Sequence, residues 1–191
     1  GCVLGPRPVD QHVAGFERLG AKVHESQGYI TAIAKALKGA EIFFDRPSHT
    51  GTENIMMAAV LAEGNTTIIN AACDPEVIDL ANFLNRMGAK IKGEGTTRME
   101  ITGVKKLRGA EYKVMPDRLE VGTFILATGI CGGKIELAPA NADDLQILLS
   151  KLTESGMTFK IGKNSITASR KGKASPVKIT TFPYPGFPTL W

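Results

Sequence analysis

The first residues of the chain place a cysteine between glycines and close to an arginine. Gly1 and Gly5 flank Cys2, so we expect its thiol on a mobile loop that leads into a helix whose first turn holds Arg7 and Pro8. Exposure, a nearby cation and the positive end of a helix each lower a thiol pKa below its reference of about 8.5. The pattern predicts a reactive cysteine, and an incidental cysteine in a flexible terminus is the alternative.

Two charged residues and a histidine belong to the same predicted helix. The guanidinium of Arg7 is suited to bidentate binding of phosphate or carboxylate, and Asp10 can accept hydrogen bonds from a base or a sugar. An ordinary solvated pair is the alternative for both. His12 falls on the apolar face of the helix, so we expect it to be hydrogen-bonded and half-buried rather than a catalytic base.

A second polar segment, residues 45–52, joins a predicted strand at residues 42–44 to a helix that begins near Gly51. Hydroxyl residues at a helix N-terminus, together with its free backbone N–H groups, form an anion pocket that suits a diphosphate. Plain capping is the alternative, because Thr50 and Glu53 have the spacing of a capping box. Capping leaves three residues of the segment without a role, namely Arg46, Ser48 and His49.

An internal repeat organises the elements that must position these residues. Residues 19–23 recur as residues 87–91 and, more loosely, as residues 155–159, with an offset of 68 residues each time. The apolar spacing of the preceding helix recurs with it. Each copy reads as a helix, a glycine stop, two short strands, a further strand, a second helix and another strand. This pattern predicts an α/β fold in which helices cover sheets.

Punctuation residues refine this prediction in the middle copy. Asp74 and Pro75 start a helix, Gly88 ends it, and strands follow near residues 89–92 and 99–102. A domain boundary is expected where a strand meets Pro116 and a helix begins near Asp117, which divides the chain into residues 1–115 and 116–191. A continuous solenoid is the alternative.

Composition narrows the class of function. The 191 residues are 43% hydrophobic and 22% charged, with a formal net charge of +4, which is typical of a globular protein with anionic partners. The basic residues are interspersed with carboxylates, which favours small phosphorylated ligands over nucleic acid. Apolar runs are too short to span a bilayer and no basic-then-apolar leader opens the chain, so we expect a cytoplasmic protein. Three cysteines without paired spacing argue against a disulfide framework or a zinc site, and we expect Cys73 and Cys131 to be structural.

The order of motifs resembles the UDP-N-acetylglucosamine enolpyruvyl transferases. Gly1-Cys2 followed by Arg7-Pro8-Val9-Asp10 is the signature of that family. Further blocks extend the resemblance along the whole chain: Leu61-Ala62-Glu63-Gly64, Ala81-Asn82-Phe83-Leu84, Met87-Gly88-Ala89-Lys90-Ile91, Pro116-Asp117-Arg118 and Phe187-Pro188-Thr189. The related shikimate-pathway enolpyruvyl transferases share the fold but lack the reactive cysteine.

The resemblance implies a fold. Members of the family form a two-domain inside-out α/β barrel of six βαβαββ-type repeats, and the present chain spans fewer than three of them. Residues 1–115 would be the rear part of the domain that carries the reactive loop, and residues 116–191 a partial second domain. The remainder of the same two-domain chain would then be a partner, and Gly1 in place of methionine also suggests a piece of a longer protein.

The resemblance also implies a reaction. The 3-hydroxyl of UDP-N-acetylglucosamine attacks C2 of phosphoenolpyruvate while C3 gains a proton, and the adduct then expels phosphate. Cys2 would donate the proton and would be alkylated by fosfomycin, and Arg7 would hold the phosphate of phosphoenolpyruvate. The residues that contact the uridine would be Pro8, Val9, Asp10 and Gln11. The residues that line the rest of the nucleotide would be Arg46, Pro47, Ser48 and His49. No metal or organic cofactor is implied.

Two departures from the family keep alternatives open. His49-Thr50 stands where many relatives have Val-Gly, and Leu190 follows Thr189 where the family has an aspartate that accepts the proton of the sugar hydroxyl. A catalytically silent UDP-sugar-binding or regulatory module is therefore an alternative to the enzyme. A nucleic-acid-binding relative is a further alternative, which the lack of a clustered basic and aromatic surface disfavours. We expect the 191 residues alone to be inactive.

Overall fold

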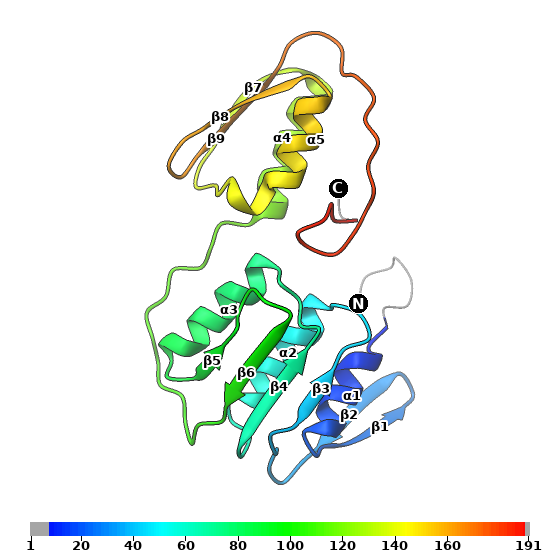
Figure 1. Cartoon of the computed structure of the whole chain (residues 1–191), viewed down its shortest axis with the longest axis vertical. Coiled ribbons are helices and arrows are strands. Elements are labelled where there is room, and N and C mark those ends of the chain that lie inside the picture. The colour runs from blue at the N-terminus through cyan, green and yellow to red at the C-terminus, as the bar shows by residue number, and fades with distance from the viewer. Residues whose placement is uncertain (1–7, 190–191) are drawn as a thin grey trace. The chain divides into compact units, whose positions relative to one another are not determined.

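The computed structural model describes residues 8–189 and divides into two compact units (Figure 1). The N-terminal unit is Gly1–Lys113 and the C-terminal unit is Val114–Trp191. Each unit has its own sheet, its own helices and its own core, and each is described separately below.

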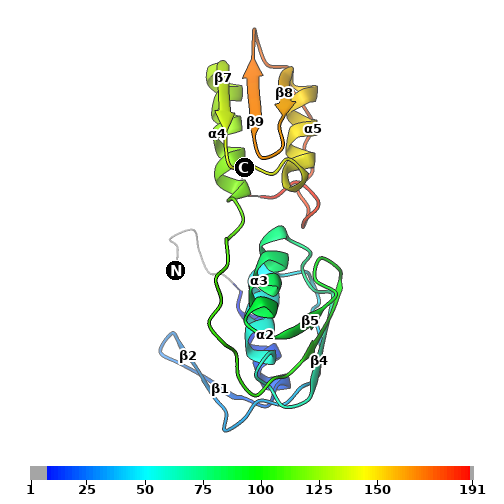
Figure 2. The ribbon, with the colours of Figure 1, turned by 90° about the vertical axis from the view of Figure 1, so that its left-hand side faces the viewer.

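Within residues 8–113, the N-terminal unit has three helices, a four-stranded sheet and a hairpin. Its elements are α1 (Asp10–Arg18), β1 (Lys22–Ser26), β2 (Tyr29–Ile33), β3 (Glu41–Phe43), α2 (His49–Ala59), β4 (Asn65–Ile69), α3 (Pro75–Arg86), β5 (Lys90–Lys92) and β6 (Arg98–Thr102). The sheet order is β3-β4-β6-β5, with β3 parallel to β4 and the other pairs antiparallel. Strands β1 and β2 form a separate antiparallel hairpin. Figure 2 shows α2 and α3 on the same side of the four-stranded sheet.

Alternation along the strands explains this layer. Ile91, Met99 and Ile101 are at most 4% exposed, while their neighbours Lys92 and Glu100 are exposed to solvent. Side chains of a strand point to opposite faces in turn, so one face of the sheet packs on the helices and the other meets water. Helix α3 supplies the matching apolar stripe from Val77, Ala81 and Leu84.

The C-terminal unit repeats the arrangement on a smaller scale. Its elements are α4 (Arg118–Cys131), β7 (Gly133–Leu137), the short 3-10 helix η1 (Asp143–Leu145), α5 (Gln146–Glu154), β8 (Met157–Ile161) and β9 (Ile166–Arg170). The sheet order is β7-β9-β8, all antiparallel, and α4 and α5 cover one face (Figure 2). Asp117 caps α4 by accepting hydrogen bonds from two backbone N–H groups, those of Leu119 and Glu120. Its core includes Ile125, Leu145, Leu148, Met157, Ile166 and Ala168.

The predicted repeat of 68 residues is present in the structure. The three related helices α1, α3 and α5 end at Arg18, Arg86 and Glu154, and β4 and β7 have the same offset. The glycine stops that follow the helices are Gly20, Gly88 and Gly156, with φ of 93°, 103° and 99°. Only glycine adopts this left-handed conformation without strain, which explains why the stop recurs. The further strand expected in every copy is present as β3 but has no counterpart in residues 103–117.

Two helix starts differ from the sequence prediction. Helix α1 begins at Asp10, with Val9 as its N-cap residue, rather than at Arg7 and Pro8. Pro8 and Val9 precede the helix, and Arg7 lies outside the described residues. Helix α2 begins at His49, slightly before the predicted start near Gly51, and its N-cap is Ser48 rather than Thr50.

The segment that follows β6 is tied to the N-terminal unit along its length. Backbone N–H groups of Gly103, Val104 and Arg108 donate to the carbonyls of Gly64, Val60 and Met87 at 2.9, 2.8 and 2.9 Å. Farther on, the Tyr112 hydroxyl donates to Asp79 Oδ1 at 2.8 Å. Burial and this hydrogen bond raise the pKa of Tyr112 to about 12. We call residues 103–112 the strap.

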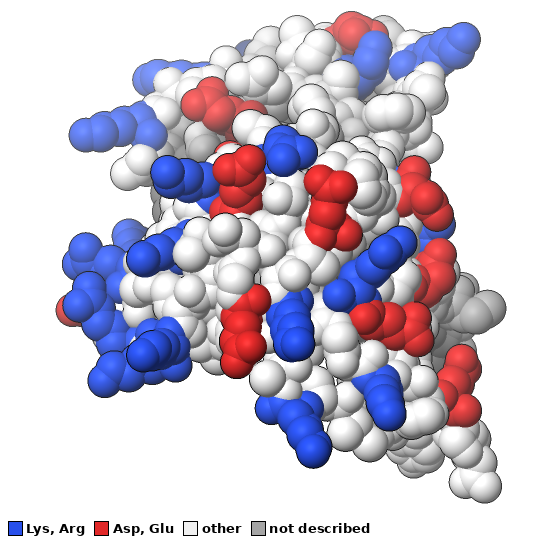
Figure 3. Space-filling model, turned by 60° about the horizontal axis from the view of Figure 1, so that its bottom comes forward, with Lys and Arg blue, Asp and Glu red and all other residues white. Residues whose placement is uncertain are grey.

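Charges are mixed over the surface. Figure 3 shows acidic and basic side chains interspersed on one face of the molecule, with basic side chains denser toward its left-hand edge. None of the helices in residues 8–189 combines the length and the apolar character needed to cross a membrane.

Candidate functional site

An ion pair joins the two segments that the sequence singled out. Nη2 of Arg46, in the loop between β3 and α2, donates to the two carboxylate oxygens of Asp10 at 3.0 and 3.3 Å. The two side chains are 54% and 58% exposed, so the pair adds little to stability, about 0–1 kcal/mol. Both charges remain accessible to a ligand.

The N-terminus of α2 lies directly beyond Arg46 and is capped by Ser48. Ser48 is extended, with φ −133° and ψ 113°, and its Oγ accepts from the Gly51 N–H at 3.1 Å. This replaces the capping box expected at Thr50 and Glu53, because an N-cap residue must stand outside the helix and α2 begins at His49. The N–H groups of His49 and Thr50 have no acceptor within the helix, and the helix dipole is positive here.

A histidine of α1 is hydrogen-bonded to the start of α2. His12 is half-buried, as predicted, and its Nδ1 is 2.8 Å from Asn54 Nδ2. Its Nε2 is 3.4 Å from Thr50 Oγ1. Sequence reasoning missed Asn54, although its spacing of four residues from Thr50 places both on one face of α2.

One carboxyl group near the site has a perturbed pKa. Glu53 of α2 is partly buried, and burial raises the pKa of its carboxyl above the ordinary value. His49 opposes this effect by lowering the pKa, and the carboxylates of Glu76 and Asp74 add to the rise. The charged form of Glu53 is therefore disfavoured in the folded protein.

The remaining site residues predicted from the sequence fall into three groups. Cys2 and Arg7 lie outside the described residues. Those exposed beside the ion pair or the cap are Pro8, Val9, Pro47 and His49. Gln11 is different, because it is 7% exposed and its side-chain amide atoms have no hydrogen-bond partner in the structure.

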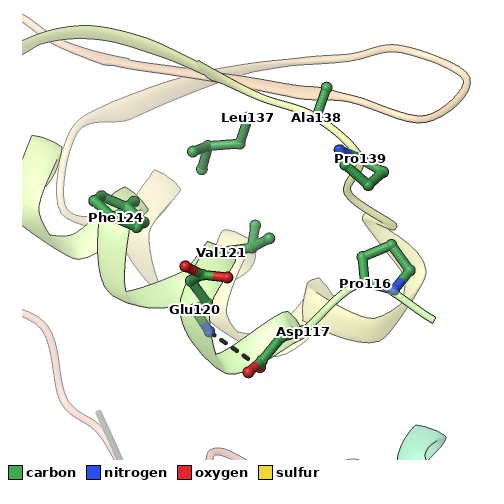
Figure 4. A pocket seen from close by; sticks show the side chains of 8 residues that line it. All are labelled: Pro116, Asp117, Glu120, Val121, Phe124, Leu137, Ala138 and Pro139. Atoms are coloured by element: carbon green, nitrogen blue, oxygen red, sulfur yellow. Dashed lines mark hydrogen bonds between the residues drawn. The ribbon is translucent and has the colours of Figure 1, made fainter. Parts of the chain in front are cut away.

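One cavity lies beside the ion pair, and another lies in the C-terminal unit. One of about 220 Å³ lies between α1 and β3 and is lined by Asp10, Gln11 and Asp45 among others. The second, of about 350 Å³, belongs to the C-terminal unit and lies between the start of α4 and the end of β7 (Figure 4). Glu120 and Phe124 border it together with Pro139. Among residues 8–189, no three His, Cys, Asp or Glu side chains form a group that could hold a metal ion.

The two cysteines that the structure describes differ in environment. Cys73 is partly buried, and burial, followed by the charge of Asp74, raises its thiol pKa. Cys131 is exposed at the end of α4 rather than packed in a core. Exposure makes Cys131 the more accessible of the two to alkylating reagents.

Comparison with known proteins identifies the family. The EPSP synthase (3-phosphoshikimate 1-carboxyvinyltransferase) family model matches residues 1–191. UDP-N-acetylglucosamine 1-carboxyvinyltransferase 2 of Carboxydothermus hydrogenoformans is 50% identical over 99% of this chain and 46% of its own length. The Thermodesulfovibrio yellowstonii UDP-N-acetylglucosamine 1-carboxyvinyltransferase is 47% identical with the same coverage. The chain spans about half the length of these curated relatives.

Solved structures agree on the fold. The enolpyruvyl transferase NikO from Streptomyces tendae superposes with a TM-score of 0.80 at 20% identity, over 96% of this chain and 47% of that one. EPSP synthase from Acinetobacter baumannii gives 0.57 at 21% identity, over 86% and 40%. The predicted resemblance and the predicted incomplete α/β barrel are thereby confirmed, and the solenoid alternative is not needed. The chain belongs to the EPSP synthase family.

Proposed function

We propose that the protein of which this chain is part transfers enolpyruvyl from phosphoenolpyruvate to the 3-hydroxyl of UDP-N-acetylglucosamine, with release of phosphate. The observation that carries this proposal is the 47–50% identity, over 99% of the chain, to relatives named for that transfer. The reaction is the first committed step of peptidoglycan synthesis, so a cytoplasmic location and a role in cell shape and division belong to the same proposal.

Within this reaction we assign roles by position. Cys2 donates the proton to C3 of phosphoenolpyruvate, and Arg7 binds its phosphate. Asp10 accepts hydrogen bonds from the uridine, which requires it to exchange its contact with Arg46 for a contact with the ligand. The amide of Gln11 is buried, so its contact to the uridine would come from the backbone.

The start of α2 suits the diphosphate of the nucleotide. The N–H groups of His49 and Thr50, the positive helix end and the accessible guanidinium of Arg46 together favour a double negative charge. Ser48 and Pro47 hold the turn that presents these donors. Over most of the face that Figure 3 shows, basic side chains are interspersed with acidic ones, which favours a small anionic ligand over nucleic acid.

Fosfomycin tests the assignment of Cys2. We expect mass spectrometry to find the epoxide adduct on Cys2 and on neither Cys73 nor Cys131, because alkylation needs the reactive loop and not exposure alone. Iodoacetamide serves as the control and should label the exposed Cys131 ahead of Cys73, whose raised thiol pKa lowers the thiolate fraction. Equal fosfomycin labelling of all three would contradict the assignment.

A second candidate function is a silent UDP-sugar-binding module, favoured by Leu190 in the place of the family's aspartate. Calorimetry with UDP-N-acetylglucosamine, followed by a phosphate-release assay on the full-length protein, separates the two. Binding with release supports the transferase, and binding without release supports the module. We expect no phosphate release from the 191-residue chain by itself.

A further inference from the structure

Asn54, His12 and Thr50 form a hydrogen-bonded row that ends in the first turn of α2. Asn54 Nδ2 lies 2.8 Å from His12 Nδ1, and because an amide nitrogen donates, this orientation of Asn54 corresponds to the tautomer in which Nδ1 accepts. The proton of the neutral imidazole is then on Nε2. The contact with Asn54 thus selects one tautomer of His12, in the way that a partner of one ring nitrogen decides the protonation of the other.

This tautomer decides what the Thr50 hydroxyl can do. His12 Nε2–H faces Thr50 Oγ1 at 3.4 Å, so the hydroxyl oxygen accepts and its hydrogen cannot return to His12. The Thr50 side chain is exposed and stands beside the N–H groups of His49 and Thr50. Its O–H is available for an acceptor outside the protein, and hydrogen bonds in a chain strengthen one another.

We propose that Thr50 donates its hydroxyl hydrogen to the diphosphate of the bound nucleotide, and that His12 and Asn54 are positioning residues that keep Thr50 a donor. The inference rests on the nucleotide site of the proposed function and adds a binding residue to it. Nothing in the capping of α2 requires these three side chains, because Ser48 and the backbone provide the cap.

Calorimetry on the 191-residue chain tests the role of Thr50. Thr50→Val keeps the shape of the side chain and removes the hydroxyl, and we expect it to weaken UDP binding roughly tenfold, the loss typical of a hydrogen bond to a charged group. Thr50→Ser keeps a hydroxyl and should stay within about threefold of the unmodified chain. Uridine lacks the diphosphate, so its affinity should be the same for all three proteins.

Nitrogen-15 NMR of the histidine side chains tests the positioning residues. We expect the His12 ring of the unmodified chain to show a protonated Nε2 and an unprotonated Nδ1. Asn54→Leu should produce a mixture of tautomers, and it should reduce UDP affinity less than Thr50→Val does. A ring protonated on Nδ1 in the unmodified chain, or a Thr50→Val variant that binds UDP normally, overturns this inference while the nucleotide site stands. Failure of the unmodified chain to bind both UDP and UDP-N-acetylglucosamine rejects the site itself, and the role of Thr50 with it.

Discussion

At the scale of single residues, the candidate site keeps its charges where a ligand can reach them. Asp10 and Arg46 are more than half exposed and neutralise each other across 36 residues of sequence. An exposed pair contributes little to folding, so the protein loses little when a ligand separates the two groups. Glu53, by contrast, is partly buried and has a raised pKa, so its charge affects stability.

We expect Glu53→Gln to raise the free energy of unfolding at neutral pH. Burial raises the pKa of Glu53 above its value in the unfolded chain, so the stability linked to its protonation is full below the unfolded pKa and is lost as the pH rises through the folded pKa. Glutamine resembles the protonated acid at every pH. Urea denaturation at a series of pH values should therefore give the same free energy of unfolding for the two proteins in acid. As the pH rises to neutral, the variant should become increasingly more stable than the unmodified chain. A variant that is less stable at neutral pH would contradict this account.

The sequence supported some of these residue assignments and not others, for a physical reason. A helical period tells which side chains face the core, so His12 could be assigned a half-buried environment, whereas Asp10 was assigned only the capacity to accept hydrogen bonds. The partners Arg46 and Asn54 could not be paired with them, because contacts between segments 36 and 42 residues apart depend on how α1 and α2 pack. Sequence offered no signal that the amide of Gln11 would be buried.

At the scale of elements, residues that block or permit a backbone conformation gave the more reliable predictions. Helix α3 starts after Asp74 and stops before Gly88, as expected. Helix α4 starts after Asp117, also as expected. Aspartate is favoured as an N-cap residue, and glycine is favoured where φ is positive, so both residue types mark helix ends in the sequence. The start of α2 was misplaced because three hydroxyl residues within five positions, Ser48, Thr50 and Thr52, are all acceptable caps by type.

Substitution of Ser48 separates capping from ligand binding. Ser48→Ala removes the acceptor of the Gly51 N–H, and we expect a loss of about 1 kcal/mol in the free energy of unfolding. Ser48→Asp retains a cap, so its stability should match that of the unmodified chain, while its negative charge should weaken UDP binding. Chemical denaturation and calorimetry on the same samples measure both effects. Equal UDP affinity for Ser48→Asp and the unmodified chain would count against a diphosphate at this helix end.

The strap offers a matched pair of glycines. A Cβ on Gly103 would overlap the carbonyl oxygen of Ala62, whereas a Cβ on Gly109 would have nothing within 4 Å. We expect Gly103→Ala to cost about 2 kcal/mol or more, because the strap must lift away from the N-terminal unit. Gly109→Ala should be neutral or slightly stabilising, since it only reduces the freedom of the unfolded chain. Thermal unfolding of the two variants provides the measurement, and similar melting temperatures would argue against a tightly held strap.

At the scale of the whole molecule, the repeat explains how much of the fold could be predicted. Copies offset by 68 residues share helices, glycine stops and paired strands, because each copy meets the same packing requirement. The strand β3 could not be transferred to the middle copy, where the corresponding residues 109–111 belong to the strap and form no strand. Local pattern specifies which segments can be strands, and tertiary packing decides which of them find a partner.

Two cores without shared residues imply that the units lose their structure separately. Leu148 is fully buried in the core of the C-terminal unit, and Met56 is fully buried in the core of the N-terminal unit. We expect Leu148→Ala to destabilise the C-terminal unit by about 2–5 kcal/mol through the cavity it leaves. Hydrogen exchange measured by mass spectrometry should then accelerate in α5, β8 and β9 and stay unchanged in α2, β4 and β6.

Met56→Ala is the mirror experiment, with faster exchange expected in α2, β4 and β6 alone. The outcome decides whether the candidate site depends on the N-terminal unit alone. The site belongs to that unit, because it consists of Asp10, His12, Arg46 and the start of α2. If the units are independent, the UDP affinity of Leu148→Ala should equal that of the unmodified chain under conditions in which the N-terminal unit stays folded. Accelerated exchange in both units after either substitution would mean that they fold as one cooperative body, and the nucleotide site would then depend on both cores.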